Sequence, residues 1–182
     1  MDTWVIIASG QSLTDEQINL VKAAKDAGKI KGVIAVSNVG IDKAPWADAL
    51  VSHDSAWWTS YPEAVKFAGK KYSRNAVPGT IGYNKPFMRG GINSGLMAMY
   101  IAKYCFEADR LILLGFDMHG THYFGPHVGE RLRNTPPDVF AKHMKQFDKF
   151  SDRFRGHAVI NSTIGSALTI FPYVELREAL CI

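Results

Sequence analysis

The sequence lacks any apolar run of about eighteen residues, the length that a membrane-spanning helix requires. Its first residues, Met1 to Trp4, also lack the basic region and the small-residue cleavage site of a signal peptide. We therefore expect a cytoplasmic protein. Cysteine is scarce as well, because Cys105 and Cys181 are the only two, and both should be reduced thiols in that compartment.

Internal repeats, a linker, the HExxH pattern of zinc enzymes and the complete three-glycine fingerprint of dinucleotide-binding folds are also missing. What the sequence has is the composition of a folded protein, with 47% hydrophobic and 21% charged residues. A chain of 182 residues is long enough to bury one substantial core. We therefore predict a single domain over residues 1–182.

The net charge of +4 is modest and spread out, with two basic stretches along the chain. The first contains Lys66, Lys70, Lys71 and Arg74, and the second contains Lys142, Lys145, Lys149, Arg153 and Arg155. Asp148 and Asp152 are interleaved with the second stretch, which is typical of a solvated helix face. Attraction to an anionic partner, nucleic acid included, is the alternative.

The segment 90–120 organises the predicted fold as a turn, a helix, a buried strand and a polar loop. Five residues recur at helical spacing and predict one stripe facing a core: Met97, Ile101, Tyr104, Cys105 and Ala108. Leu111 to Leu114 form a continuous apolar run, which is typical of a strand covered on both faces.

Polar residues stand at both ends of this helix–strand unit. Asn93, Ser94 and Gly95 precede the helix, where free backbone N–H groups can bind an anion such as phosphate. Asp117 and His119 follow the strand, and ligands of open parallel sheets lie at the carboxyl ends of strands. The segment therefore predicts a ligand site, with an ordinary helix cap and solvent loop as the alternative.

The amino-terminal stretch repeats this pattern. Val5 to Ala8 predict a strand, residues 9–13 a turn rich in serine and glycine, and Thr14 opens a helix with the form of a capping box. This order is the opening of a nucleotide-binding α/β fold, in which Gly10 lets the backbone approach a ligand. Further strands are predicted over 32–36, 49–51 and 157–161.

Between these strands, Trp57, Trp58 and Tyr61 form an aromatic cluster that we expect to pack in the core, with stacking on a ligand ring as the alternative. A short helix is predicted over 62–68, and an irregular connection over 77–89 because of its prolines and glycines. A longer helix over 137–154 has an apolar side made by Phe140, Met144, Phe147, Phe150 and Phe154. His143 belongs to that helix, and we expect it to be packed rather than catalytic.

The loop beyond Asp117 carries His119, His122 and His127, three histidines within nine residues. A neutral imidazole in such a place can act as a general acid or base. A zinc site is a second interpretation, although no cysteine lies nearby in the sequence. The third interpretation is that these are ordinary loop histidines.

Two motifs together resemble a known group of enzymes. Residues 5–13, VIIASGQSL, resemble the first-strand motif of the bacterial family 42 sialyltransferases and of the related 6-hydroxymethylpterin diphosphokinase MptE-like family. Asn93-Ser94-Gly95 with the apolar helix behind it, and the strand ending in Leu114-Gly115-Phe116-Asp117, resemble their second signature. Short proteins of tailed phages share this pattern, and the likeness covers residues 5–161.

The resemblance implies a single Rossmann-like α/β domain, with a mainly parallel sheet flanked by helices, and a nucleotide or nucleotide-sugar ligand of the CMP type. Carried over by position, the nucleotide-binding residues would be Ser9, Gly10, Ser12, Asn38, Asn93, Ser94 and Gly95. The phosphate-contacting tyrosines of the sialyltransferases fall at His119 and Tyr123. Asp54 falls near the place of a sialyltransferase asparagine, and an acidic residue there is more similar to the pterin-kinase relatives.

The sialyltransferases also have a catalytic histidine base in a stretch of the form H-Y-x-G-H. Residues 122–127 are similar with one residue inserted, which implies His127 as the base and His122 as its substitute. Gln11 departs from the family pattern, which has proline at that place. The chain is also short for a lid over a sugar acceptor, so sialic acid specificity is not implied.

We therefore expect a nucleotide-dependent transferase, first of all a glycosyltransferase that uses a nucleotide-sugar donor with a histidine general base. Arg131 or Arg133 would offset charge on the departing phosphate. In a second hypothesis, Asp54 and Asp117 hold Mg²⁺ for diphosphate transfer. A third is a protein, phage-encoded and acting in the host cytoplasm, that binds a nucleotide without turnover. The acceptor, whether glycan, small molecule or modified DNA, and assembly as a homo-oligomer stay open.

Overall fold

The computed structural model describes residues 1–88, 92–127 and 135–182. Its centre is one seven-stranded sheet with the order β5-β4-β3-β2-β1-β6-β7, in which every pairing is parallel. The strands are β1 (Thr3–Ile7), β2 (Gly32–Val36), β3 (Ala49–Ser52), β4 (Lys70–Ser73), β5 (Ile81–Gly82), β6 (Arg110–Leu114) and β7 (Ala158–Asn161). The predicted α/β fold with a parallel sheet is confirmed.

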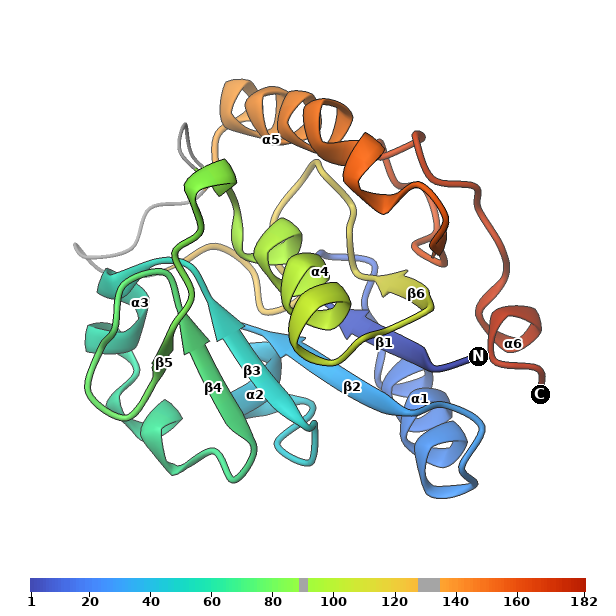
Figure 1. Ribbon diagram of the computed structural model, residues 1–182, viewed down its shortest axis with the longest axis horizontal. Helices are drawn as coiled ribbons and strands as arrows, with labels where there is room; N and C mark the ends of the chain where they lie inside the picture. The colour runs from blue at the N-terminus through green and yellow to red at the C-terminus, as the bar shows by residue number, and fades with distance from the viewer. Residues whose placement is uncertain (89–91, 128–134) are drawn as a thin grey trace.

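Helices connect these strands and cover both faces of the sheet. They are α1 (Asp15–Asp26), α2 (Val39–Asp42), α3 (Ser55–Ser60), α4 (Ser94–Cys105), α5 (Pro137–Ser151) and α6 (Leu176–Ala179), with the 3-10 helices η1 (Pro62–Lys66), η2 (Pro86–Met88) and η3 (Asp152–Phe154). Figure 1 shows α4 and α5 on one face of the sheet and α1 and α2 on the other. In the described part of the chain, no helix is long and apolar enough to cross a membrane.

The strands are apolar on both sides because each side meets a different layer of helices. Ile6 and Leu113 pack with α4 and α5, whereas their neighbours Val5 and Ile112 pack with α1 and α6. Successive side chains of a strand point to opposite faces, so an uninterrupted apolar run is what such a sheet requires. This explains why the apolar runs were strong enough to predict β1, β2, β3, β6 and β7.

The first helix begins where the sequence indicates. Thr14 Oγ1 accepts a hydrogen bond from the backbone N–H of Gln17, and the side chain of Gln17 accepts one from the N–H of Thr14. This reciprocal capping box satisfies two of the N–H groups that have no partner inside a helix. Ile18, Val21 and Ala24 of this helix are buried.

The prediction of a single core-facing stripe on α4 is wrong. Residues 95–102 are buried on every side, because α4 lies between the sheet and α5 with η3. Tyr104 is 47% exposed and Cys105 is also exposed, since the last turn of α4 extends beyond this cover. A helix that is apolar all round is a buried helix, and the i, i+4 spacing selected only part of its surface.

Two strands at one end of the sheet, β4 and β5, were not predicted. β4 coincides with part of the first basic stretch, and β5 lies inside the segment that we expected to be irregular. β4 begins with Lys70 and Lys71 and ends with the buried Tyr72 and Ser73, and β5 is only two residues long. Such short strands give too little periodicity to be recognised, and the pairing of β4 with β3 and of β5 with β4 is what makes them strands.

The order of the strands creates a place for a ligand. From β1 the chain builds the sheet outward through β2, β3, β4 and β5, and it then returns to place β6 on the other side of β1. The connections on the two sides of this switch point leave β1 and β6 in opposite directions, which opens a crevice at their carboxyl ends.

Candidate functional site

A cleft of about 440 Å³ lies at the carboxyl ends of β1, β2, β3 and β6. The first turn after β1, the start of α4, the loop after β6 and the first turns of α5 all contribute to its walls. Its size is within the range of small-molecule sites, which is roughly 300–1,000 Å³. The cleft therefore stands where the fold predicts a ligand and is large enough to hold one.

Most of the residues predicted for the site line this cleft. They are Ser9, Gly10, Asn38, Asp54, Asn93, Ser94, Gly95, Asp117, His119, His122 and His127. Ser12 and Tyr123 do not line it, and Arg131 and Arg133 lie outside the described residues. The two turns that the sequence singled out, one after β1 and one before α4, thus meet at the same cleft.

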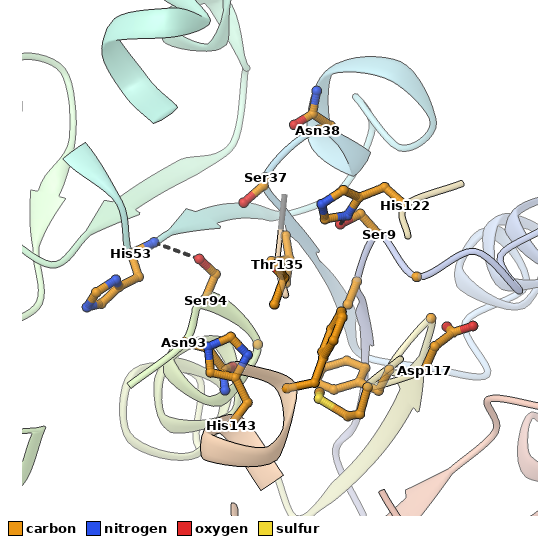
Figure 2. Close-up of a pocket in the computed structure, with 18 of the residues that line it drawn as sticks. Ser9, Ser37, Asn38, His53, Asn93, Ser94, Asp117, His122, Thr135 and His143 are labelled. Atoms are coloured by element: carbon orange, nitrogen blue, oxygen red, sulfur yellow. Dashed lines mark hydrogen bonds between the residues drawn. The ribbon is translucent and has the colours of Figure 1, made fainter. Parts of the chain in front are cut away.

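Asp117 holds the turn after β1 in place through two hydrogen bonds. Its Oδ1 accepts a hydrogen bond from the backbone N–H of Ser12 at 2.9 Å, and its Oδ2 accepts one from Ser12 Oγ at 2.9 Å. Only 2% of Asp117 is exposed, and in Figure 2 its carboxylate points away from the centre of the cleft. A Cβ on Gly10 would lie 1.8 Å from Oδ2, so glycine is required there by the contact with Asp117.

The loop after β6 folds back onto the same turn. The backbone N–H of Tyr123 donates to the carbonyl oxygen of Ser9 at 3.1 Å, and Ser9 Oγ lies 3.0 Å from Nδ1 of His122. The hydroxyl of Tyr123 donates to a carboxylate oxygen of Asp42, the last residue of α2, at 2.9 Å. Tyr123 therefore anchors the loop to α2, and its side chain lies outside the cleft.

His122 and His127 form a small cluster of rings with Phe124. The ring centroids of the two histidines are 4.7 Å apart, and Phe124 stacks on His122 at 4.8 Å. Burial lowers the pKa of both imidazoles below the ordinary 6.5, and the neighbouring His127 lowers that of His122 further. Both rings are consequently neutral at neutral pH, the form in which a histidine can accept a proton.

The start of α4 forms the opposite wall. Asn93 is the N-cap, and its Oδ1 accepts from the backbone N–H of Leu96 at 2.8 Å. Within the described residues, the backbone N–H groups of Ser94 and Gly95 have no acceptor. A Cβ on Gly95 would lie 2.7 Å from the ring of Phe116, so this glycine lets α4 approach the end of β6.

Two histidines that sequence reasoning did not select also line the cleft. His53 follows β3 directly, and its backbone N–H donates to Ser94 Oγ at 3.0 Å. His143 reaches the cleft from α5, so the expectation that it is only packed is incomplete. Figure 2 shows both on the side of the cleft opposite Ser9 and His122. Five of the six histidines thus line one cleft. His53 could have been found from the sequence, because it stands directly after a predicted strand.

The aromatic cluster packs as expected, while one member also borders the site. Trp57 and Trp58 are buried, and Nε1 of Trp57 donates to Oδ1 of Asn38 at 2.8 Å. This hydrogen bond orients Asn38 at the end of β2. Beside it, Ser37 has a φ of +51°, and Met118 after β6 has a φ of +59°. Two strained residues on the rim of one cleft are typical of a functional site.

The carboxylates of the cleft are not arranged as a pair. Asp54 is the N-cap of α3 and accepts from the backbone N–H of Ala56, and both oxygens of Asp117 are engaged by Ser12. His119 donates from Nε2 to the carbonyl oxygen of Gly165 at 2.9 Å. Among residues 1–88, 92–127 and 135–182, no three histidine, cysteine, aspartate or glutamate side chains are placed to hold a metal ion.

Comparison with known proteins identifies the fold. No protein-family model and no curated protein sequence matches the chain. Among solved structures, it is similar to MAf glycosyltransferase from Magnetospirillum magneticum AMB-1, with a TM-score of 0.67 and 13% sequence identity. The similarity covers 96% of this chain and 34% of that one, so this chain spans about a third of its length. It establishes a Rossmann-like α/β fold, and the resemblance to the sialyltransferase and MptE-like families stays a prediction.

Proposed function

We propose that this protein is a glycosyltransferase that uses a nucleotide-sugar donor, with His127 as general base. The observation that carries the proposal is the meeting of three features at one cleft. These are the Ser9–Gly10 turn, the start of α4, whose first N–H groups have no acceptor among the described residues, and the neutral pair His122 and His127. The first two suit a phosphate and a ribose, and the third suits removal of a proton.

The reaction follows from this arrangement. The acceptor hydroxyl loses its proton to His127 as its oxygen forms a bond to the anomeric carbon of the donor sugar. The bond between that carbon and the phosphate oxygen breaks, and the nucleotide leaves with the electron pair. His127 then releases the proton to solvent. A base in this role contributes about 10²–10⁴-fold to the rate.

Two further arguments support this function. The solved structure with the same fold is called a glycosyltransferase, and the similarity covers 96% of this chain and 34% of that one. The resemblance of residues 5–13 and 93–95 to the sialyltransferases favours a cytidine nucleotide. Ser9, Asn38 and Ser94 would then contact the nucleotide, while Asp117 would act by holding the first turn in place.

The proposal is tested first by ligand screening. Cytidine, uridine, guanosine and adenosine nucleotides and their sugars are compared by the shift in melting temperature. A ligand at 100 times its Kd stabilises the native state by about 2.7 kcal/mol. Nucleotide release from the donor so identified is then measured for the wild type, for His127→Ala and for His157→Ala, which removes the one histidine outside the cleft.

We expect His127→Ala to lower turnover about 10²–10⁴-fold while leaving donor affinity near that of the wild type. His157→Ala should match the wild type. Equal loss of binding and turnover in His127→Ala would count against its role as base. Saturable binding without turnover by the wild type would indicate a nucleotide-binding protein, and loss of turnover in excess EDTA would favour the Mg²⁺-dependent diphosphotransferase.

A further inference from the structure

His53 and Arg74 are brought together by the register of two neighbouring strands, β3 and β4. β3 and β4 pair in parallel with Ser52 opposite Ser73, so the residues that follow them, His53 and Arg74, leave the sheet side by side. Nη1 of Arg74 lies 3.3 Å from Nε2 of His53. His53 lines the cleft and Arg74 does not, which places the guanidinium behind the imidazole.

The chemistry of arginine determines which nitrogen of His53 carries the proton. A guanidinium has only donors and keeps its charge at every physiological pH. Nε2 of His53 must therefore accept, which leaves the ring proton on Nδ1 and the imidazole neutral. Within the described residues Arg74 has no carboxylate in ion-pair distance that would draw it away from this contact.

Several groups around His53 inside the cleft are also donors, while the nearby carboxylate of Asp54 has one oxygen engaged by the backbone N–H of Ala56. Ser94 Oγ accepts from the backbone N–H of His53, so its own hydroxyl hydrogen is left to donate (Figure 2). The backbone N–H groups of Ser94 and Gly95 lie beside it without an acceptor in the described part of the chain. In Figure 2, His143 lies on the same side of the cleft. A group of hydrogen-bond donors next to one another suits a ligand group made of several anionic oxygens.

We propose that His53 donates its Nδ1–H to a phosphate oxygen of the ligand, and that Arg74 is the positioning residue that fixes this tautomer. The proposal rests on the proposed function only for the identity of the ligand. It gives the two sides of the cleft different tasks. His53 and Ser94 hold the phosphate, and His127 takes the proton on the other side.

The tautomer is tested by NMR on the uniformly ¹⁵N-labelled protein. Two-bond ¹H–¹⁵N correlations of the imidazole rings distinguish a protonated Nδ1 from a protonated Nε2, and His53→Asn assigns the signals. We expect the Nδ1–H form of His53 in the wild type and a mixture of tautomers in Arg74→Met. An Nε2–H form in the wild type, or no change in Arg74→Met, would overturn the inference.

Binding is tested with two substitutions that differ in which nitrogen they replace. The amide nitrogen of asparagine can take the place of Nδ1, whereas that of glutamine takes the place of Nε2. We expect His53→Asn to bind inorganic pyrophosphate about as well as the wild type and His53→Gln to bind it about tenfold or more weakly, the size of one hydrogen bond to a charged group. Equal affinities in the two variants would contradict the proposal, and their melting temperatures check that both are folded.

The same titrations separate this inference from the proposed function. If pyrophosphate shifts the His53 signals but no nucleotide sugar binds or turns over, the transferase proposal fails and the anion contact stands. If a nucleotide sugar binds and turns over with equal affinity in His53→Asn and His53→Gln, the transferase stands and the role of His53 is wrong. If neither ligand affects His53, both are wrong.

Discussion

The two sides of the cleft are held in place by different forces. On one side, backbone and side-chain hydrogen bonds join the Ser9 turn to Asp117 and to the loop that carries His122 and His127. On the other, packed elements carry the histidines, because His53 directly follows β3 and His143 lies one turn before the fully buried Phe147 of α5. A loop can thus be positioned by a few directional contacts, whereas a helix is positioned by its buried face.

The packed side should be the more sensitive to loss of volume. Phe147 is fully buried and meets the ring of Phe116 at 6.2 Å, so Phe147→Ala should lower the free energy of unfolding by about 3–5 kcal/mol. It should also weaken nucleotide binding, because α5 no longer holds His143 at the cleft. Urea unfolding and titration with the screened ligand measure both effects. Phe147→Leu is the matched control, and a similar loss in that variant would show that volume is not the cause.

The hydrogen-bonded side should depend on Asp117. Asp117→Asn replaces one of the two acceptors that Ser12 uses with an NH₂ group, and we expect the free energy of unfolding to fall by about 1–3 kcal/mol. Asp26→Asn breaks an exposed ion pair with Lys22 and should change it by only about 0.5 kcal/mol. Chemical denaturation compares the two. A cost for Asp117→Asn no larger than for Asp26→Asn would mean that the Ser12 contacts do not hold the turn.

The pH dependence of stability compares the two sides directly. Burial lowers the pKa of His122 and His127 on one side and of His53 and His143 on the other below the ordinary 6.5. Below pH 6.5 the unfolded chain therefore binds protons that the folded chain resists, so stability should fall as the pH falls. Urea unfolding at pH 7.5 and pH 5.5 measures this effect.

Removing one half-buried histidine should make that fall smaller. We expect His143→Gln and His122→Gln each to reduce the difference in unfolding free energy between the two pH values, and the larger reduction identifies the side that resists protonation more. Stability that stays constant or rises on acidification of the wild type would contradict the assignment of neutral, half-buried imidazoles to this cleft.

Local sequence determined the elements whose pattern is complete within a few residues. The apolar runs of β1, β2, β3, β6 and β7, the capping box at Thr14 and the amphipathic α5 are recognisable because burial on two faces or on one stripe imposes a period on the sequence. The same reasoning found most of the cleft, since the residues after parallel strands gather at one edge of the sheet.

Only the tertiary structure decided which of these residues meet. Tyr104 and Cys105 have core-like spacing, yet they are exposed because the cover over α4 ends before its last turn. Arg74 reaches His53 through the pairing of β4 with β3, and His143 reaches the cleft through the docking of α5. Periodicity reports which face of an element is apolar, but strand order and helix packing decide what covers that face and join residues far apart in the chain, and no local pattern encodes those contacts.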